Sequence, residues 1–451
     1  MNKQITDSIV YVGANDYDID LFEGHYVVPE GMAYNSYVIH DEKTAIMDTI
    51  DQRKTKEWLV NLKVALQGEK PEYLIIQHME PDHSANLTRF MEKYPAAVMV
   101  ATQKAFPLLK QFYGAEYPGR ELIVKDGDTL SLGTRTLTFF TAPMVHWPEV
   151  MMSYDDGDKV LFSADAFGKF GALDYDDPEG WACEARRYYF GIVGKYGAQV
   201  QAVLKKLAGR EIRAICALHG PMLTDDIDYY LDTYNTWSSY GVESEGVAIC
   251  YTSVYGHTKQ AAELLAEKLH ALGCPKAALS DLARDDMHEA VEDAFRYGKL
   301  VLATTTYDAG VFPIMQDFIL RLTEHNYQNR RIGIIENGSW APAAAKSMKA
   351  LLEGCKNISY PETTVTIRSA PDAETELLQA AQTVREVSGK PVDIRVGKPG
   401  YGLNYSGSNK RLKNEIKDLS FTPFKQAVRE LFLYYQSNRD RIDKNLLLTD
   451  K

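Results

Sequence analysis

The chain has 451 residues, which at about 150 residues per domain predicts two or three domains. Hydrophobic residues make up 45% and charged residues 25% of the chain, which is typical of a globular protein and not of a disordered or fibrous one. Lys and Arg number 50 against 62 Asp and Glu, giving a net charge of −12. This acidic balance argues against a general binder of nucleic acids or anionic membranes. We therefore expect small molecules or other proteins as partners.

The five cysteines are widely spaced and form no C-x-x-C pair. A thiolate zinc site, a rubredoxin-type iron site and a disulfide framework are therefore not expected. The segment Met1–Tyr11 lacks the apolar core of a signal peptide, and no run approaches the roughly 18 apolar residues of a membrane span. These features predict a cytoplasmic protein with reduced thiols and no membrane contact. The cysteines are Cys183, Cys216, Cys250, Cys274 and Cys355.

The first part of the chain, residues 1–243, reads as a β-rich domain. From Ile9 to about Asp51, short apolar runs alternate with turn residues, which predicts strands and hairpins. A helix over Lys54–Leu66 and a buried strand over Tyr73–Ile76 follow, and then a polar loop. Strand-rich stretches cover Glu121–Phe140 and Val150–Phe162. The pattern predicts layered sheets with helices outside.

The second part, residues 244–392, alternates apolar strands with helical patterns. This rhythm is typical of βαβ units and a parallel sheet. The predicted strands are Val247–Tyr251, Leu300–Thr304 and Ile332–Ile335, and the predicted helices are Thr258–Leu272, Ile314–Leu322 and Ala343–Leu352.

The third part, residues 393–451, starts with a linker or extended arm over Gly397–Gly407, which is rich in Gly, Tyr and Ser. Further on, Thr422 is a suitable N-cap and Pro423 suits the first helical position. Apolar residues follow at helical spacing, so we expect a helix that docks on the body or on a second subunit. No role is assigned to this extension.

Four potential metal ligands occur within six positions, directly after the buried strand that ends at Ile76. In an extended loop, alternate side chains lie on one side, so His78, Glu80 and Asp82 are expected to converge on one cavity. His83 is expected to face a second position, so two metals are geometrically possible. Each of three further candidates follows a predicted strand. They are His146, Asp165 and His219.

This block resembles the H-x-H-x-D-H block of the metallo-β-lactamase superfamily, with Glu80 in place of the second His. A zinc hydrolase site favours imidazoles around an open water position, whereas extra carboxylates favour redox-active iron. With four imidazoles and three carboxylates, pattern and spacing resemble the flavodiiron proteins, also called A-type flavoproteins. Further phrases similar to this family are Gly31–Tyr37, Ser163–Gly168 and Ala185–Tyr189.

The resemblance implies a set of site residues. One iron would be held by His78, Glu80, His146 and Asp165, and the other by Asp82, His83, His219 and the same Asp165, which bridges the two. His25 and one of the neighbours Tyr188 and Tyr189 would line the substrate pocket.

The turn after the strand Val247–Tyr251 is rich in hydroxyl groups and leads into a helix, so it can bind a phosphate at the helix N-terminus. The Walker A and G-x-G-x-x-G patterns are absent from this turn, which disfavours ATP and NAD. It resembles the FMN phosphate loop of flavodoxins. Two later loops end strands at the edge where doubly wound sheets bind ligands. The implied FMN contacts are Ser253, Val254, Tyr255, Gly256, His257, Thr258, Thr304, Thr305, Thr306, Tyr307, Asp308, Gly310, Asn337, Gly338, Ser339 and Trp340.

The family resemblance implies a metallo-β-lactamase-like αββα sandwich followed by a flavodoxin-like doubly wound parallel sheet. It also implies an oxidoreductase that reduces dioxygen to water, nitric oxide to nitrous oxide, or both, at a non-haem di-iron centre. FMN would relay electrons from an external donor, a rubredoxin or a flavin reductase, because no C-x-x-C pair follows residue 390. A head-to-tail homodimer, or a dimer of dimers, would bring FMN of one subunit beside the irons of the other, with Trp340 and Glu80 near the gap.

Two alternatives stay open on the sequence. The first is a zinc-dependent hydrolase fused to a flavodoxin module, in which water is the second reactant. The second is a flavodoxin-like electron carrier whose β-rich domain serves only for docking. The sequence does not choose between dioxygen and nitric oxide, because gas preference depends on the groups around the metal ligands.

Overall fold

The computed structural model describes residues 3–175, 177–178, 180–370 and 424–437. It divides into two units, Met1–Asn337 with Ala341–Thr366, and Gly338–Trp340 with Ile367–Lys451. The domain boundaries at residues 243/244 and 392/393 remain predictions. Within the described ranges, no helix combines the length and the apolar character needed to cross a bilayer.

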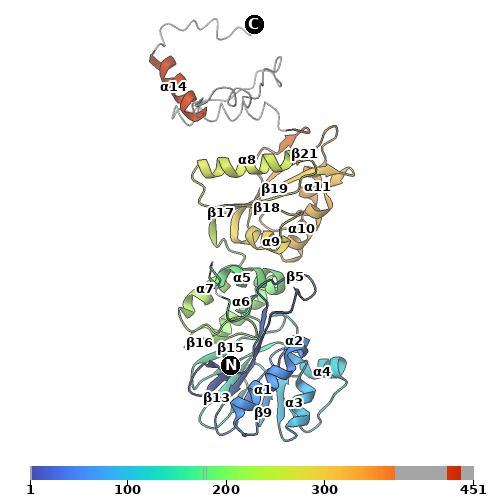
Figure 1. The fold of residues 1–451 in the computed structure, drawn as a ribbon, viewed down its shortest axis with the longest axis vertical. Coiled ribbons are helices and arrows are strands. Elements are labelled where there is room, and N and C mark those ends of the chain that lie inside the picture. The colour runs from blue at the N-terminus through green and yellow to red at the C-terminus, as the bar shows by residue number, and fades with distance from the viewer. Residues whose placement is uncertain (1–2, 176, 179, 371–423, 438–451) are drawn as a thin grey trace. The chain divides into compact units, whose positions relative to one another are not determined.

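Two sheets form the centre of the N-terminal part of the first unit (Figure 1). One has seven strands in the order β1-β2-β7-β8-β9-β10-β11, with parallel pairing from β8 to β11. The other has five strands in the order β12-β13-β14-β15-β16. The seven strands are β1 (Lys3–Gln4), β2 (Ile9–Tyr11), β7 (Tyr37–Ile39), β8 (Ala45–Met47), β9 (Tyr73–Ile75), β10 (Val98–Thr102) and β11 (Glu121–Val124). The five are β12 (Thr129–Ser131), β13 (Thr136–Thr141), β14 (Met151–Asp155), β15 (Val160–Phe162) and β16 (Ala214–Cys216).

The core explains why these strands are apolar on both faces. Ile39 and Ile75 of the first sheet share one buried cluster with Phe139 and Phe162 of the second, so that cluster fills the space between the sheets. The residues that alternate with them, such as Val38, belong to a second cluster with the helices. Sheet on sheet with helices outside is the predicted αββα sandwich. These helices are α1 (Thr55–Leu66), α3 (Leu87–Lys93), α4 (Ala105–Tyr113), α5 (Trp181–Tyr188), α6 (Gly197–Leu207) and α7 (Ile227–Ser238).

Two short hairpin-like pairs precede the third strand of the large sheet. They are β3 (Ala14–Asp16) with β6 (Met32–Tyr34) and β4 (Leu21–Phe22) with β5 (Tyr26–Val27). These pairs bring Phe22 and Tyr34 to the ring of His219.

The third sheet has the order β18-β17-β19-β21-β22, which is 2-1-3-4-5 in chain order, with parallel pairing of β17 to β18 and β19, and of β19 to β21. This is the flavodoxin-like order, and it reverses between β17 and β19. The sheet confirms the predicted doubly wound fold. Its strands are β17 (Ser244–Tyr251), β18 (Ala277–Asp281), β19 (Tyr297–Tyr307), β21 (Arg331–Asn337) and β22 (Val365–Ile367), and its helices are α8 (His257–Ala271), α9 (Met287–Arg296), α10 (Pro313–Glu324) and α11 (Ala344–Leu351).

One loop of this sheet differs from the prediction. The strand expected to end at Thr304 continues to Tyr307 and turns back into β20 (Gly310–Val311), which pairs antiparallel with β19. Asp308 and Ala309 form the turn with positive φ, 46° and 60°. The cause is a two-residue hairpin turn, a conformation that Asp tolerates, where we expected an open loop.

In the second unit, α14 (Phe424–Ser437) covers the predicted C-terminal helix. The predicted cap at Thr422 and Pro423 and the predicted linker over Gly397–Gly407 lie outside the described residues.

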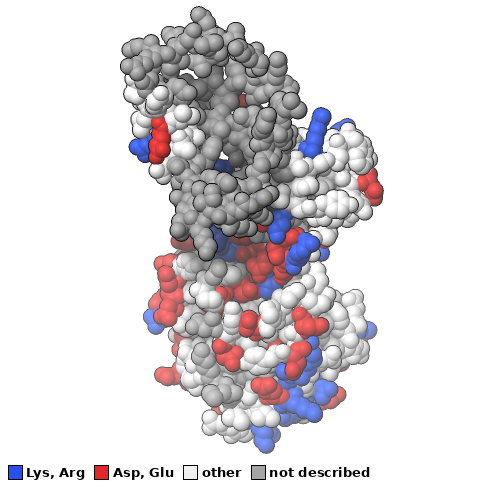
Figure 2. Space-filling model, turned by 45° about the horizontal axis from the view of Figure 1, so that its top comes forward, with Lys and Arg blue, Asp and Glu red and all other residues white. Residues whose placement is uncertain are grey.

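Acidic and basic side chains are interspersed over the face drawn in Figure 2, and the described Lys and Arg on that face form no continuous basic surface. Binding of a duplex nucleic acid requires a basic surface. This face therefore gives no support for such binding, as expected from the acidic net charge.

Candidate metal centre and flavin site

The ligand block starts in irregular backbone and ends in a helix. After β9 the chain continues without regular structure to Glu80, whose φ is −58° and ψ 140°, and Pro81 then opens the short helix α2 (Pro81–Ser84) at its first position. The helical turn rotates Asp82 away from the side on which His78 and Glu80 lie. The expectation that Asp82 converges with these two residues was therefore wrong.

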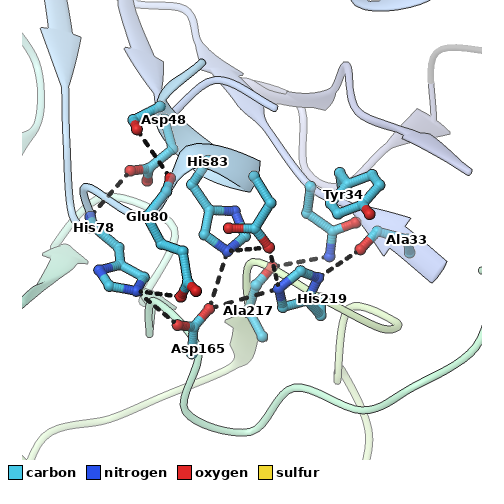
Figure 3. Close-up of polar contacts among 12 residues, drawn as sticks. Ala33, Tyr34, Asp48, His78, Glu80, His83, Asp165, Ala217 and His219 are labelled. Carbon is cyan, nitrogen blue, oxygen red and sulfur yellow. Dashed lines mark hydrogen bonds and ion pairs between the residues drawn. The ribbon is translucent and has the colours of Figure 1, made fainter. Parts of the chain in front are cut away.

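The first group of ligand atoms joins His78, Glu80, His146 and Asp165 (Figure 3 labels all but His146). His78 Nε2 lies 3.1 Å from Glu80 Oε2, 3.3 Å from His146 Nε2 and 3.2 Å from Asp165 Oδ2. His146 Nε2 lies 3.0 Å from Glu80 Oε2. Two imidazole nitrogens and two carboxylate oxygens thus face one point.

The second group joins Asp82, His83 and His219. Asp82 Oδ2 lies 3.3 Å from His83 Nε2 and 3.2 Å from His219 Nε2. Asp165 Oδ1 lies 3.2 Å from His83 Nε2 and 3.8 Å from His219 Nε2. The two oxygens of Asp165 therefore face different groups, as a carboxylate bridging two cations requires.

Further polar groups hold the ligands in place. His78 Nδ1 lies 2.8 Å from Glu149 Oε1, and His219 Nδ1 lies 2.7 Å from the carbonyl oxygen of Ala33. Both oxygens act as acceptors, so each Nδ1 carries the proton and each Nε2 is left free for the centre. Asp48 Oδ1 accepts from the backbone N–H of Gln77 at 2.7 Å.

Sequence reasoning missed Glu149 and Asp48. Glu149 stands three residues after His146 in the same loop, and Asp48 directly follows β8. A carboxylate close to a ligand or at a strand end is the signal that could have found them.

The loop that carries His219 is fixed by a buried amide. Asn35 Nδ2 donates to the carbonyl oxygens of Ala217 at 2.9 Å and Gly220 at 2.8 Å. Replacing Asn35 with Ala leaves both acceptors without this donor, so we expect a loss of about 2 kcal/mol in unfolding free energy and weaker metal binding. Asn61→Ala is the control, because the Asn61 amide donates to the carbonyl oxygen of Gly13 and not to the His219 loop. For this control, thermal unfolding should show destabilisation, while metal binding stays unchanged. Equal metal affinity in both variants contradicts the assignment.

The charges of the centre depend on each other. Burial alone raises the pKa of Asp165, but His78, His83 and His146 together hold it well below its usual range. Burial alone lowers the pKa of His146, but Asp165 and Glu80 raise it to about 9. Imidazoles that hold protons this strongly among ionised carboxylates indicate a place built for positive charge.

The raised pKa of His146 predicts that the stability of the metal-free protein depends on pH. The pKa of His146 is raised from 6.5 to about 9, so its contribution to stability is fully present below pH 6.5 and is lost as the pH rises to about 9. We expect the metal-free protein to unfold at a lower temperature at pH 9 than at pH 6.5. His146→Asn, which lacks the titrating group, should show a smaller difference. Identical pH profiles for the two proteins contradict the prediction.

The donor set fits a pair of metal ions. His78, His83, Asp165 and His219 are at most 1% exposed. Among the described residues, Asp82 Oδ1 and His83 Nδ1 are buried without a polar partner. Asp82 Oδ2, both oxygens of Asp165 and His83 Nε2 meet only one another and the other ligand imidazoles. Buried polar atoms without partners are costly, and metal coordination would satisfy them.

The three residues expected to line the substrate pocket differ in position. The Tyr188 ring lies 5.6 Å from the His219 ring, beside the centre. Tyr189 packs instead against Tyr234 and Trp237, because consecutive residues of a helical turn point in different directions. His25 packs against the rings of Tyr26 and His288. Of the two tyrosines, one of which was expected in the pocket, Tyr188 is therefore the one beside the centre, and the roles of His25 and Tyr188 in a substrate pocket stay predictions.

Glu23 is a carboxylate near the centre that we did not predict. Glu23 is exposed, and the pKa of its carboxyl is raised by partial desolvation and by the charge of Glu80, with His146 opposing this shift. It stands two residues before His25, at the turn between β4 and β5.

The predicted phosphate loop lies where the third sheet reverses its order. Ser253 Oγ accepts from the backbone N–H of Gly256 at 3.1 Å, and Gly256 has a φ of 92°, which suits glycine. Helix α8 starts at His257, with Thr258 in its first turn. The backbone N–H groups at this helix end can bind a phosphate.

The first and second loops of this predicted site are in contact. Thr252 Oγ1 and Thr304 Oγ1 are 2.6 Å apart. Thr305 Oγ1 is buried without a hydrogen-bond partner among the described residues. Thr306 Oγ1 accepts from the backbone N–H of Ala343 at 2.9 Å.

The other predicted flavin contacts differ in burial, from exposed Tyr255 to buried Asn337. Tyr255 is 89% exposed, and Tyr307, Asp308 and Gly310 lie on the β19–β20 hairpin. Asn337 Nδ2 donates to Thr258 Oγ1 at 3.4 Å. Val254 is exposed. The remaining predicted contacts, Gly338, Ser339 and Trp340, belong to the second unit.

Comparisons with known proteins agree with this geometry. A model of the family described as "ODP family beta lactamase" matches residues 32–220. The chain is 27% identical over 364 residues to an anaerobic nitric oxide reductase flavorubredoxin of Vibrio vulnificus, covering 78% of this chain and 73% of that protein.

Two solved structures share the fold over most of the chain. The rubredoxin oxygen:oxidoreductase of Desulfovibrio gigas has a TM-score of 0.77 and 26% identity, covering 84% of this chain and 96% of that one. The flavodiiron protein of Giardia intestinalis has a TM-score of 0.78 and 26% identity, covering 84% and 94%. With the two ligand groups that meet at Asp165 and the flavodoxin-like strand order, these similarities are consistent with a flavodiiron protein.

Proposed function

We propose that this protein is an oxidoreductase that reduces dioxygen to water, nitric oxide to nitrous oxide, or both, at a non-haem di-iron centre. Electrons reach the centre from an external donor, such as rubredoxin or a flavin reductase, with FMN as the second cofactor. The relatives named above as nitric oxide reductase and oxygen oxidoreductase support this proposal. The observation that carries it is Asp165, whose two oxygens face two separate groups of ligand atoms.

In this proposal His78, Glu80 and His146 would hold one iron, Asp82, His83 and His219 would hold the other, and Asp165 would be shared by both. When bound, the two irons supply two electrons at one place and stabilise negative charge on the reduced gas, with electrons delivered through FMN. Glu80 gives this set a third carboxylate, which favours iron over zinc.

Aromatic side chains shape the surroundings of the centre. The rings of Phe22, Tyr34 and Tyr188 lie 5.3 Å, 5.8 Å and 5.6 Å from the ring of His219. Trp147 stands edge-on to His78 at 5.2 Å. These rings exclude water from the ligands on two sides. This packing leaves His78 and His219 at most 1% exposed.

The position of the flavin follows from the fold. The turn from Ser253 to Thr258 would hold the FMN phosphate through backbone N–H groups and hydroxyls, at the sheet edge where the strand order reverses. Thr304 and Thr305 would lie beside it, because Thr304 is hydrogen-bonded to Thr252 of the first loop. Backbone N–H groups and hydroxyls of this loop bind the phosphate without a lysine.

We further propose a cytoplasmic location and a head-to-tail dimer or dimer of dimers. All five cysteines are free, which favours a reducing compartment. Tyr255 and Trp340 are 89% and 92% exposed, which leaves each ring available to a partner surface. Light scattering of the loaded protein measures the oligomeric state directly.

The experiment that tests the proposal starts with protein reconstituted anaerobically with iron and FMN. We expect two irons and one FMN per chain. After reduction under argon, parallel electrode measurements should show consumption of dioxygen, nitric oxide or both, and the ratio of the two rates gives the gas preference. Two tightly held zinc ions with hydrolysis of a thioester or lactone, and no gas consumption, contradict the proposal and favour the hydrolase alternative.

A further inference from the structure

Glu149 is a buried carboxylate that contacts only the first group of ligands. Its side chain is 1% exposed. Oε1 accepts from His78 Nδ1 at 2.8 Å and from the backbone N–H of Met79 at 3.0 Å. Oε2 is buried without a hydrogen-bond partner among the described residues. The only ion pair found for this carboxylate in the described part of the chain is with His78.

The second group has no equivalent of this contact. His219 Nδ1 donates to the carbonyl oxygen of Ala33, which is a neutral acceptor. His83 Nδ1 is buried and has no hydrogen-bond partner within the described ranges. Both groups otherwise offer two imidazoles, one carboxylate of their own and one oxygen of Asp165. The charge of Glu149 is therefore the main difference between the two positions.

Asp48 is another buried carboxylate near the ligand block, and different groups balance its negative charge. Asp48 accepts from the backbone N–H groups of Gln77 and His78 and from the side-chain amide of Gln77. These three donors balance much of its charge, and none of them is an imidazole. Asp48 therefore orders the backbone of the loop, whereas Glu149 acts on a ligand ring.

A carboxylate that accepts the Nδ1 proton of an imidazole makes Nε2 a stronger donor to a metal and fixes the ring plane. The buried negative charge of Glu149 also needs a nearby positive charge, and a metal ion bound at His78 Nε2 provides it. Both effects favour a cation at the first group and leave the second group nearly unaffected.

We propose that Glu149 is a positioning residue that makes the His78–Glu80–His146 position the tighter of the two metal positions, so that it fills first. This rests on the proposed function in one respect, that the site binds two metal ions. The second position, at Asp82, His83 and His219, then fills at a higher metal concentration.

The test is a titration of metal-free protein with cobalt(II), whose visible absorption reports the ligands around each ion. For the unchanged protein we expect two steps, one ion in each. In Glu149→Gln the first step should weaken by about 10- to 100-fold and its absorption bands should shift, while the second step keeps its affinity and bands. A merely structural role of Glu149 does not shift the bands of one ion alone.

Thr102→Val is the matched control. Thr102 Oγ1 donates to the backbone oxygen of Glu149 at 2.8 Å, so this change loosens the backbone but keeps the carboxylate. We expect both cobalt steps to stay near those of the unchanged protein. If Glu149→Gln does not fold, Glu149→Asp takes its place, with a smaller loss expected in the first step only.

Three outcomes overturn the inference: equal weakening of both steps, two unchanged steps, or the same loss in Thr102→Val. The failure of the proposed function looks different, because a protein that binds no pair of metal ions shows fewer than two steps before any substitution is made.

Discussion

Replacing Asp165 with Ala is expected to abolish gas reduction and to leave the protein unable to hold two metal ions close together. Asp165 is 1% exposed, and its oxygens lie 3.2 Å from His78 Nε2 on one side and 3.2 Å from His83 Nε2 on the other. Removing a group that only orients a ligand costs about 10- to 100-fold in metal affinity or activity. The loss of a shared ligand should exceed this range, so we expect a fall of more than about 100-fold in turnover.

The measurement combines iron content, FMN content and gas consumption. We expect fewer than two irons per chain, unchanged FMN and no gas consumption above background. Asp18→Asn is the matched control, because the Asp18 side chain is 92% exposed and its ion pair is with Lys54. It should keep both irons and full activity.

The same variant separates the proposed function from an electron carrier. If the β-rich domain served only for docking, Asp165→Ala would transfer electrons as well as the parent, and the parent itself would not consume dioxygen or nitric oxide. Full gas consumption by Asp165→Ala would also contradict the assignment of Asp165 as the bridging ligand.

The sequence was sufficient to select candidate ligands that the fold brings together, because these residues follow apolar strands whose ends meet at one edge. Their role as metal ligands stays a prediction. His78, His146, Asp165 and His219 are four examples from four different loops. The grouping of Asp82 was not predictable by alternation, because Pro81 starts a helical turn within the block. The implied assignment of Asp82 to the second position agrees with the geometry.

The surroundings of the ligands depend on contacts between distant segments, and these leave little trace in the sequence. Glu149 contacts His78 across 71 positions of the chain. Tyr188 and Tyr189 are neighbours in sequence, yet only Tyr188 packs against His219, because the direction of each ring is set by the helical turn. The loop after β19 was also not predictable from the sequence. The turn at Asp308 makes it a hairpin, and the spacing of apolar residues does not indicate such a turn.

Replacing Glu80 with His is expected to change which metal the centre retains. This substitution recreates the H-x-H-x-D-H block, with three imidazoles at the first position in place of two. Imidazole-rich sites favour zinc, whereas carboxylates favour harder, redox-active ions. Glu80 Oε2 lies 3.1 Å from His78 Nε2 and 3.0 Å from His146 Nε2, so residue 80 stands where a metal at this position would be held.

Protein loaded with equal amounts of iron(II) and zinc(II) under argon provides the measurement. We expect the parent to retain mainly iron and Glu80→His mainly zinc, with a fall in gas reduction of more than about tenfold. Glu80→Asp is the control, because it keeps the carboxylate and should keep the preference for iron with a smaller loss of activity. If parent and Glu80→His retain the same metals, the carboxylate at position 80 does not set the metal. The choice between hydrolase and oxidoreductase must then rest on the groups around the ligands, with Glu149, Tyr188 and Trp147 the nearest ones to substitute.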